Sequence, residues 1–573
     1  MAERNDKNMA RTVAIGVQDF EKIIQEDYFY VDKTPFIKEW WESGDSVTLI
    51  NRPRRFGKTL NLNMLEKFFS IKYANRNDLF QKFSIWKEEK YHQIQGTYPL
   101  ISLSFANIKE TNFTTTREKI CLILTNLFTE HAYLKNSDIL QQSDIDFFNR
   151  MMSVDIKDSD ITYALHQLSK FLYLYHGKKV IILLDEYDTP MQEAYVHGFW
   201  EEMVTLIRSM FNSAFKTNPY LERALMTGIT RISKESVFSD LNNLKVITTT
   251  SDSYATAFGF TEAEVFQALE EQGLAHEKEC VKKWYDGFVF GKQTDVYNPW
   301  SIINFLDTNG QYGTYWANTS SNSLVSKLIQ ESGQRIKTTF EALLRGEVIS
   351  CPIDEQIVYG QLENNETAIW SLLLATGYLK VINAEKQEEI ETGRFPKYDL
   401  MLTNHEVKRM FLIMARSWFF QVDSDYNQFI EALLQKDIEA MNAYMNRITL
   451  ETFSCFDTGK RASGTEPERF YHGFVLGLMA ELAGEYVLTS NRESGFGRYD
   501  VMLEPKDKTK DAFILEFKVR NSRKEKTLED TVAVALKQIE EKQYDTILLT
   551  KGIAKAHIYK YGFAFEGKHV LIG

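Results

Sequence analysis

Residues 46–69 read as a strand, a loop and a helix in direct succession. A β-prone run, SVTLI, is followed by the loop NRPRRFGKT and by the apolar-periodic stretch LNLNMLEKFF. In a phosphate-binding loop, backbone N–H groups cradle the phosphates, a lysine neutralises their charge and a Ser/Thr hydroxyl holds Mg²⁺. Gly57, Lys58 and Thr59 match the second half of that motif. Arg52 stands where the motif has its first glycine.

Two acidic residues follow a second apolar strand. The run VIILL, residues 180–184, leads directly into Asp185 and Glu186. Magnesium in a nucleotide site needs a carboxylate at the C-terminal edge of a strand adjoining the P-loop strand, and hydrolysis needs a second carboxylate that orients water. We therefore predict that Asp185 binds the metal and that Glu186 is catalytic. The alternative is that the pair merely opens a solvated loop.

A third strand, RALMTGIT at residues 223–230, ends in polar residues. We predict that Thr230 senses the γ-phosphate there. Arg54 and Arg55 are predicted to grip phosphate, the alternative being ion pairs with nearby acids. Arg231 is either an arginine finger acting in trans or an ordinary surface arginine.

The alternation of apolar strands with helical patterns predicts a parallel sheet covered on both faces. At 573 residues the chain is too long for one core. We predict a flexible N-terminus (1–12), a P-loop domain of the ASCE type (13–247), a helical lid (248–335), a helical, winged-helix-like connector (336–455) and a final domain (456–573). The connector is expected to be structural rather than to read DNA.

Composition restricts the setting of the protein. Neither a transmembrane stretch nor an export signal is visible, and Cys121, Cys280, Cys351 and Cys455 lack disulfide or zinc spacing. The sequence thus predicts a cytoplasmic protein with free thiols and no membrane partner. Residues 460–573 carry 19 Lys+Arg against 17 Asp+Glu, about +2, whereas the rest of the chain is about -14. This contrast permits nucleic-acid contact at the C-terminal end.

The last domain contains a second set of charged residues. GRYDVMLEP and DAFILEFKVR read as two strands of a hairpin, with Asp500 in the first strand. Glu516 and Lys518 lie two residues apart in the second strand, so their side chains share one face. Phosphodiester hydrolysis requires a metal-activated water and positive charge near the phosphorane. We predict that Asp500 and Glu516 hold Mg²⁺ and that Lys518 positions the water.

Other residues are candidates for the same site. The stretch AVALKQIEEKQY predicts a helix that contains Gln538. Glu493 and Arg498 lie close in sequence to Asp500, and Glu485 is a second candidate acid. His472 is expected to pack within a helix rather than to catalyse.

Several motifs together resemble a known family. YFYVDKTPFI, NRPRRFGKTL, LLDEYDTP, WYDGF and YNPWS are similar to those of the AAA-ATPase-like family found mainly in bacteria, whose members commonly carry a C-terminal PD-(D/E)xK nuclease domain. The resemblance runs from about Val13 into the last domain. It implies ATP or GTP binding by Lys58 and Thr59, acidic roles for Asp185 and Glu186, and a P-loop in which the missing first glycine is usual. For the nuclease domain it implies that Gln538 is presented to the metal-bound water, the alternative being a surface amide.

The sequence therefore predicts an α/β multidomain chain: a P-loop NTPase, a helical and winged-helix-like middle, and a restriction-endonuclease-like α/β domain with a mixed sheet. The expected function is an ATP-dependent control of a Mg²⁺-dependent nuclease in defence or DNA processing, with DNA favoured over RNA. A nucleotide-switched binding protein with an inactive nuclease fold is the alternative. A homo-oligomer is allowed by the sequence, as is a P-loop domain that binds nucleotide without hydrolysing it.

Overall fold

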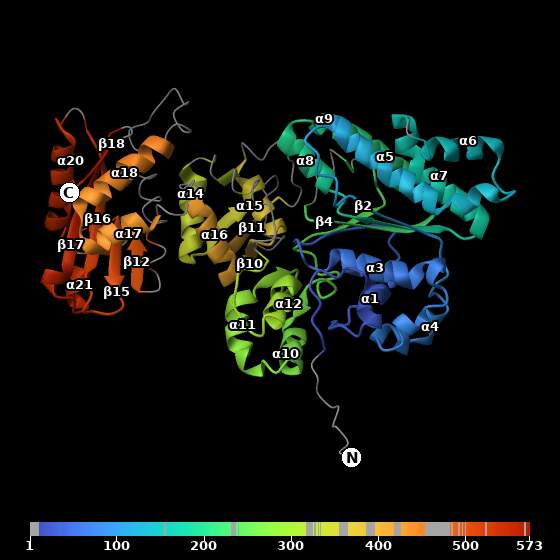
Figure 1. Cartoon of the computed structure of the whole chain (residues 1–573), viewed down its shortest axis with the longest axis horizontal. Helices are drawn as coiled ribbons and strands as arrows, with labels where there is room; N and C mark the ends of the chain where they lie inside the picture. Colours follow the sequence, from blue (N-terminus) through green and yellow to red (C-terminus); the bar gives the residue numbers. More distant parts are fainter. Residues whose placement is uncertain are drawn as a thin grey trace, which may run out of the picture. The chain divides into compact units, whose positions relative to one another are not determined.

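The structure is a computed structural model of the chain, shown in Figure 1. It describes residues 11–573 except 154–155, 231–236, 239, 317–324, 326–327, 330–331, 333, 355–364, 386–395, 418–425, 453–478, 480–481, 483–484, 491–492, 495–496, 499, 522–523 and 567–568. The chain forms two compact units. Unit 1 comprises Met1–Ser332 and Ala342–Lys408, and unit 2 comprises Gly333–Glu341 and Arg409–Gly573. The four domain boundaries expected from the sequence stay predictions.

The core of unit 1 is a five-stranded parallel sheet with the order β2-β3-β4-β1-β5. Its strands are β1 (Val47–Asn51), β2 (Leu100–Ser104), β3 (Val180–Asp185), β4 (Leu221–Gly228) and β5 (Leu244–Ile247). Every residue of β1 and β3 is buried, which explains their unbroken apolar runs. The ASCE prediction is confirmed, because β4 lies between the P-loop strand and the acidic strand.

One sequence expectation is corrected by this order. The acidic strand β3 does not adjoin the P-loop strand β1, since β4 pairs with both of them. The C-terminal end of β4 therefore lies between the C-terminal ends of β1 and β3, and residues of β4 can contact the acidic strand end.

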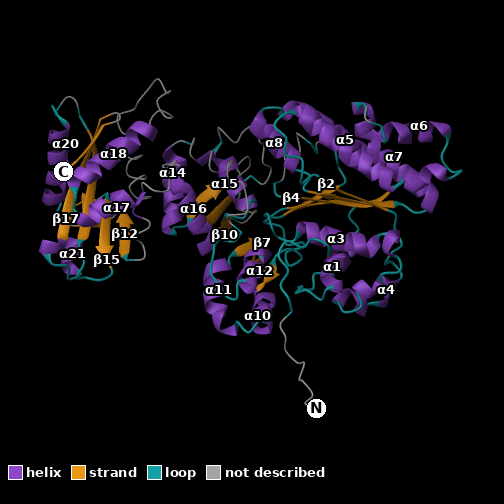
Figure 2. Ribbon diagram, viewed as in Figure 1, coloured by secondary structure: helices purple, strands orange, loops and turns teal. Residues whose placement is uncertain are grey.

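Helices cover both faces of this sheet, as Figure 2 shows. On one face lie α5 (Phe113–Glu130), α6 (Gln142–Met151), α7 (Asp158–His176), α8 (Thr189–His197) and α9 (Trp200–Phe215). On the other lie α1 (Phe20–Gln25), α3 (Lys58–Phe69) and α4 (Glu89–His92), and α2 (Pro35–Glu42) precedes β1 in the chain. The sheet is thus a buried central layer, as the sequence predicts.

The middle region of unit 1 contains two small sheets as well as helices. The first sheet, β6-β8-β7, is surrounded by α10–α12; the bounds are β6 (Phe260–Thr261), α10 (Glu262–Glu271), α11 (Lys278–Tyr285), β7 (Phe288–Phe290), β8 (Gln293–Tyr297) and α12 (Pro299–Asp307). The expected lid is therefore not entirely helical. The second sheet, β10-β11-β9, lies in the part expected to be winged-helix-like, with β9 (Ile349–Pro352), α15 (Glu366–Ala375), β10 (Leu379–Ala384) and β11 (Lys397–Leu402). The following helix, α16 (His405–Ser417), begins in unit 1 and continues into unit 2 after Lys408.

Unit 2 is built around a mixed sheet with the order β12-β15-β16-β17-β18, which confirms the predicted fold class. Only the pair β16 and β17 is parallel. The elements are α17 (Tyr426–Gln435), α18 (Ile438–Thr452), β12 (Tyr486–Ser490), β13 (Glu493–Ser494), β14 (Gly497–Arg498), β15 (Val501–Pro505), β16 (Ala512–Val519), α20 (Leu528–Glu541), α21 (Thr546–Thr550), β17 (Ile558–Glu566) and β18 (His569–Ile572), while α14 (Gln334–Arg345) extends from one unit into the other.

Alternation along β16 separates two cores. Phe513, Leu515 and Phe517 pack in a cluster with α17 and α18, whereas Ala512 and Ile514 pack in a cluster with α20. Since neighbouring residues point to opposite faces, Glu516 and Lys518 lie on the α20 side of the sheet.

Two further differences from the sequence expectations occur in unit 2. The helical stretch expected at residues 427–450 is two helices, α17 and α18, and Asp500 immediately precedes β15 instead of lying within it. Most of the helix expected between Phe470 and Tyr486 lies outside the described residues.

Candidate active sites

The phosphate loop of unit 1 ends at the N-terminus of α3. Gly57 precedes the helix with a φ of 81°, a left-handed conformation that favours glycine, and Arg55 has a φ of 64°. Lys58 is buried, and its Nζ donates to the carbonyls of Arg52 (3.0 Å) and Pro53 (2.9 Å). Burial lowers the pKa of Lys58, whereas Glu186, followed by Asp185, raises it. The ammonium is thus held within the loop beside two carboxylates.

Asp185 brings the P-loop helix and the strand ends together. Its carboxylate accepts a 2.6 Å hydrogen bond from Thr59 Oγ1 and another from Thr227 Oγ1. Burial raises the pKa of Asp185, and the hydrogen bonds from Thr227 and Thr59 oppose that shift. A hydroxyl and a carboxylate in contact are the oxygen ligands that a P-loop protein offers to Mg²⁺. The residues present therefore fit a magnesium ion.

Glu186 follows Asp185 with a φ of 51° and is only partly buried. Its Oε2 accepts a hydrogen bond from Thr189 Oγ1 at 3.1 Å. This conformation turns the chain sharply at the strand end, so Asp185 and Glu186 need not follow the alternation of a strand. Among the carboxylates, Glu186 is the one that most raises the pKa of Lys58 against the effect of burial.

Thr230 contacts a different acid from the one at the metal position. Its hydroxyl and its backbone N–H both donate to Asp188 Oδ2, at 3.0 and 2.9 Å. Thr227, which lies in β4 three residues before Thr230, is the residue whose hydroxyl donates to Asp185. Sequence reasoning missed Asp188 and the specific role of Thr227; the third acid of the motif LLDEYD was the available signal. Arg231 lies outside the described residues.

Arg54 and Arg55 contact the lid. The guanidinium of Arg55 lies 4.4 Å above the centre of the Trp300 ring. The carbonyl of Arg54 accepts hydrogen bonds from Trp316 Nε1 (3.0 Å) and Asn298 Nδ2 (3.3 Å). Phosphate binding by these arginines stays a prediction, and for Arg55 it requires that the guanidinium leave or share its position above Trp300.

Three predicted residues of unit 2 converge at one end of the β15–β16 hairpin. Asp500 Oδ2 accepts a 2.8 Å hydrogen bond from the backbone N–H of Phe517. Lys518 Nζ donates to Glu516 Oε1 at 2.9 Å. The antiparallel register, extended by one residue beyond Val501 and Leu515, sets Asp500 opposite Glu516. Two carboxylates and an ammonium therefore lie at the edge where β15 begins.

Gln538 of α20 joins this group. Its Nε2 donates to Glu516 Oε1 and, at 3.0 Å, to the hydroxyl of Tyr544. Tyr544 is buried, and burial raises its pKa, with Gln538 opposing the shift. Tyr544 was missed by sequence reasoning, although it ends the same segment as Gln538.

Glu516 is suited to hold a cation. Its side chain is only 1% exposed, and its Oε2 has no hydrogen-bond partner among the described residues. Burial, followed by the charge of Asp500, raises the pKa of Glu516 to about 7, and Lys518 lowers it. A buried carboxylate oxygen without a donor beside a second carboxylate fits a hard divalent ion such as Mg²⁺.

Of the two alternative acids, Glu485 lies away from this position. Glu485 pairs with Lys510, which lies at the far end of the hairpin from Asp500. The side chains of Glu493 and Arg498 lie outside the described residues, as does His472. The backbones of Glu493 and Arg498 pair in the short β13–β14 ladder.

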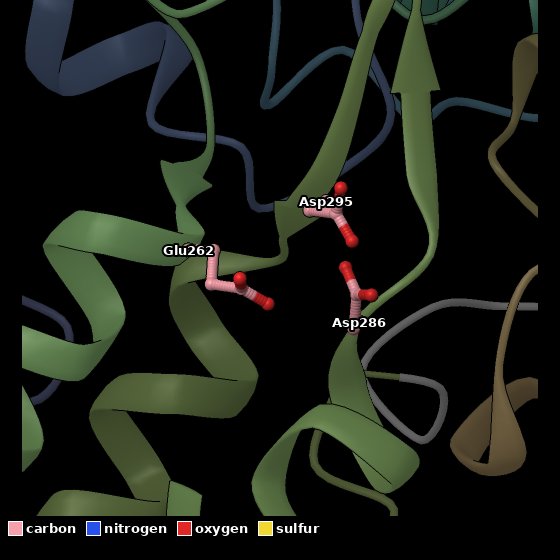
Figure 3. A group of neighbouring side chains, drawn as sticks. All are labelled: Glu262, Asp286 and Asp295. Atoms are coloured by element: carbon pink, nitrogen blue, oxygen red, sulfur yellow. The ribbon is translucent and has the colours of Figure 1, made fainter. Parts of the chain in front are cut away.

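A third acidic group lies in the lid and is shown in Figure 3. Ligand atoms of Glu262, Asp286 and Asp295 lie within 4.8 Å of one another. Burial, followed by Asp295, raises the pKa of Asp286 to about 6. Lys282 donates to Glu262 and lies 3.2 Å from Asp295. The ammonium of Lys282 thus already neutralises part of this group, and we assign it no metal.

Comparison with known proteins assigns both parts of the chain to known families. Residues 14–238 match the family described as predicted AAA-ATPase, and residues 466–573 match the PD-(D/E)XK nuclease superfamily. A curated relative, the "Uncharacterized protein in vnfD 5'region" of Azotobacter chroococcum mcd 1, is 24% identical over 403 residues, which cover 70% of this chain and 68% of the relative.

Two solved structures show a weaker likeness. A STAND ATPase with a tetratricopeptide repeat sensor from Pyrococcus horikoshii is 13% identical, with a TM-score of 0.23; the match covers 79% of this chain and 62% of that chain, less than two thirds of its length. The ORC2 protein of Aeropyrum pernix is 10% identical, also with a TM-score of 0.23, over 72% of this chain and 97% of its own. Within the described residues, no helix is long and apolar enough to span a membrane.

Proposed function

Because the chain joins an AAA-ATPase-like domain to a C-terminal domain of the PD-(D/E)XK nuclease superfamily, we propose that it is an ATP-hydrolysing protein that controls a metal-dependent nuclease. Lys58 binds the nucleotide phosphates, Thr59 and Asp185 hold Mg²⁺, and Glu186 orients the attacking water. In the second site Asp500 and Glu516 hold Mg²⁺, while Lys518 and Gln538 position water at the scissile phosphate. DNA is the favoured substrate over RNA.

The observation that carries the nuclease proposal is the environment of Glu516. A buried carboxylate with an unpartnered oxygen is costly unless a cation or proton completes it. Asp500 lies opposite, and Lys518 and Gln538 contact the same carboxylate. When bound, Mg²⁺ would supply the Lewis acid that lowers the pKa of water and neutralises developing charge. Lys518 would then lie beside the phosphate as the positive group.

The proposal predicts two activities, ATP hydrolysis and DNA cleavage, and each can be removed by its own substitution. Phosphate release from ATP and cleavage of supercoiled plasmid with Mg²⁺ or Mn²⁺ are measured for the full chain. We expect Lys58→Ala to abolish phosphate release and Asp500→Asn and Lys518→Ala to abolish cleavage. Glu504→Gln removes an acid of β15 that pairs with Lys551, away from Glu516, and serves as the control that retains cleavage.

The outcome also decides between this proposal and its alternative. Metal-dependent cleavage that persists in both Asp500→Asn and Lys518→Ala reveals a contaminating nuclease and contradicts the proposal. A wild-type protein that hydrolyses ATP and binds DNA without cutting it is the nucleotide-switched binding protein with an inactive nuclease fold.

A further inference from the structure

Arg52, which stands in place of the first glycine of the P-loop motif, is fully buried. Its guanidinium donates to four backbone carbonyls: those of Asn51 (3.0 Å), Thr248 (2.8 Å), Ser253 (3.3 Å) and Tyr254 (3.5 Å). It also lies 4.4 Å above the ring centre of Phe290 in β7 of the lid. The side chain therefore ties the entrance of the phosphate loop to the end of β5, to the following loop and to the lid.

The backbone of Arg52 is held on both sides. Its N–H donates to the carbonyl of Gly228 at the end of β4, at 3.1 Å. Its carbonyl accepts the 3.0 Å hydrogen bond from Lys58 Nζ. The side chain of Arg52 thus fixes the entrance of the loop. Its backbone carbonyl orients the Lys58 ammonium, which neutralises phosphate.

A glycine is not required at this position by backbone geometry. Among the described residues the non-glycine positions with positive φ include Arg55 but not Arg52. The following Pro53 restricts residue 52 to extended conformations, which any side chain allows. A buried guanidinium donating to carbonyls and lying over an aromatic ring adds hydrogen bonds and cation–π energy that glycine lacks. Burial lowers the pKa of Arg52 to about 9, so it remains charged at neutral pH.

We propose that Arg52 is the positioning residue of the phosphate loop, clamping the loop entrance to β5 and the lid so that its carbonyl holds Lys58 where phosphate binds. The inference rests on the proposed nucleotide binding by Lys58. It also means that restoring the glycine of the standard motif, Arg52→Gly, weakens nucleotide binding instead of improving it.

A second buried arginine provides a matched control. Arg223, near the start of β4, donates to the carbonyls of Trp40 (3.0 Å) and Trp41 (2.9 Å) and lies 4.1 Å above the Trp41 ring. Its contacts are of the same kind as those of Arg52, but it lies at the opposite end of the strand from the phosphate loop. Loss of either arginine should lower the unfolding temperature, whereas only loss of Arg52 should weaken the binding of ATP.

The test is calorimetric titration of the full chain with Mg²⁺ and ATP, with the unfolding temperature measured in parallel. The proteins are wild type, Arg52→Met, Arg52→Lys and Arg223→Met. Losing one to two net hydrogen bonds corresponds to about a ten-fold weaker affinity, which we expect for Arg52→Met. Arg52→Lys keeps the charge and some donors and should recover part of the loss, and Arg223→Met should bind as wild type does.

The outcomes separate this inference from the proposed function. Wild-type affinity in folded Arg52→Met, or equal losses in Arg52→Met and Arg223→Met, overturns the role of Arg52 while ATP binding stands. If Arg52→Met does not fold, the comparison rests on Arg52→Lys, in which unchanged affinity likewise overturns the role. A wild-type chain that does not bind ATP overturns both claims.

Discussion

Glu516 of β16 lies beside Gly562 of β17 in the parallel register of the unit 2 sheet. A Cβ atom at residue 562 would lie 2.9 Å from the carbonyl oxygen of Val532 and 3.0 Å from the Cβ of Ala535, both in α20. Glycine therefore allows α20 to approach the sheet closely beside Glu516. This approach is what lets Gln538 reach the carboxylate.

The first prediction follows from this contact. Gly562→Ala should displace α20 from the sheet and weaken the Gln538–Glu516 hydrogen bond. We expect a loss of about 1–3 kcal/mol in the free energy of unfolding and a weaker affinity for Mn²⁺, measured by denaturant titration and calorimetry. An affinity equal to that of wild type would show that the close approach does not serve the metal site.

The pKa of Glu516 predicts how the stability of the metal-free chain depends on pH. The folded-state pKa is raised to about 7 from an ordinary 4.5. A raised pKa gives stability that is fully present below pH 4.5 and is lost as pH rises through 7. Between pH 6 and 8 the loss should be about 1 kcal/mol, measured by denaturant unfolding in EDTA.

The matched control for this prediction is Glu516→Gln, which keeps the shape of the side chain and cannot titrate. The free energy of unfolding of wild type should fall relative to that of this variant as the pH rises from 6 to 8. Added Mn²⁺ should offset the loss in wild type at pH 8, because metal binding requires the deprotonated carboxylate. Identical pH profiles of the two metal-free proteins would refute the raised pKa.

Glu186→Gln should separate nucleotide binding from hydrolysis. The amide keeps the side-chain shape but cannot accept a proton, so phosphate release should fall at least about 100-fold while ATP affinity stays near that of wild type. Glu193→Gln, an acid of α8 paired with His197, is the control expected to retain activity. Full activity in Glu186→Gln would assign catalysis to another group.

Glu406 predicts a stability effect in the middle region. It is fully buried, and its two oxygens accept hydrogen bonds from Ser301 Oγ and the backbone N–H of Trp316, both at 2.7 Å. Glu406→Ala leaves these donors unpaired and should lower the free energy of unfolding by about 2–4 kcal/mol. Glu347→Ala, an exposed acid paired with Arg345, should have little effect. Similar values for the two variants would contradict the prediction.

Much of the fold could be predicted from the sequence because buried parallel strands appear as unbroken apolar runs. The run before Asp185 correctly predicted a buried strand, and the alternation around Glu516 correctly placed Glu516 and Lys518 on one face. The order of the strands in the sheet could not be predicted from such runs, because it depends on how the connections cross over the sheet. The sequence therefore did not reveal that β4 separates β1 from β3.

The same limit explains which site contacts were missed. Thr227 lies in β4 and donates to Asp185, whereas Thr230 lies in the turn after the strand and donates to Asp188. Sequence spacing does not show where that turn begins. Arg52 looked like a departure from a motif, because four carbonyls from separate segments cannot be assembled from local sequence. Gln538 was identified through the resemblance to the nuclease superfamily, and the structure places it in contact with Glu516.

The central claim is that nucleotide at Lys58 controls metal-dependent cleavage at Glu516, and plasmid cleavage by the full chain with and without ATP tests it most directly. We expect ATP to change the cleavage rate of wild type by at least about five-fold and to leave the rate of Lys58→Ala unchanged. Equal wild-type rates with and without ATP, in a protein that both binds ATP and cuts DNA, would contradict the claim.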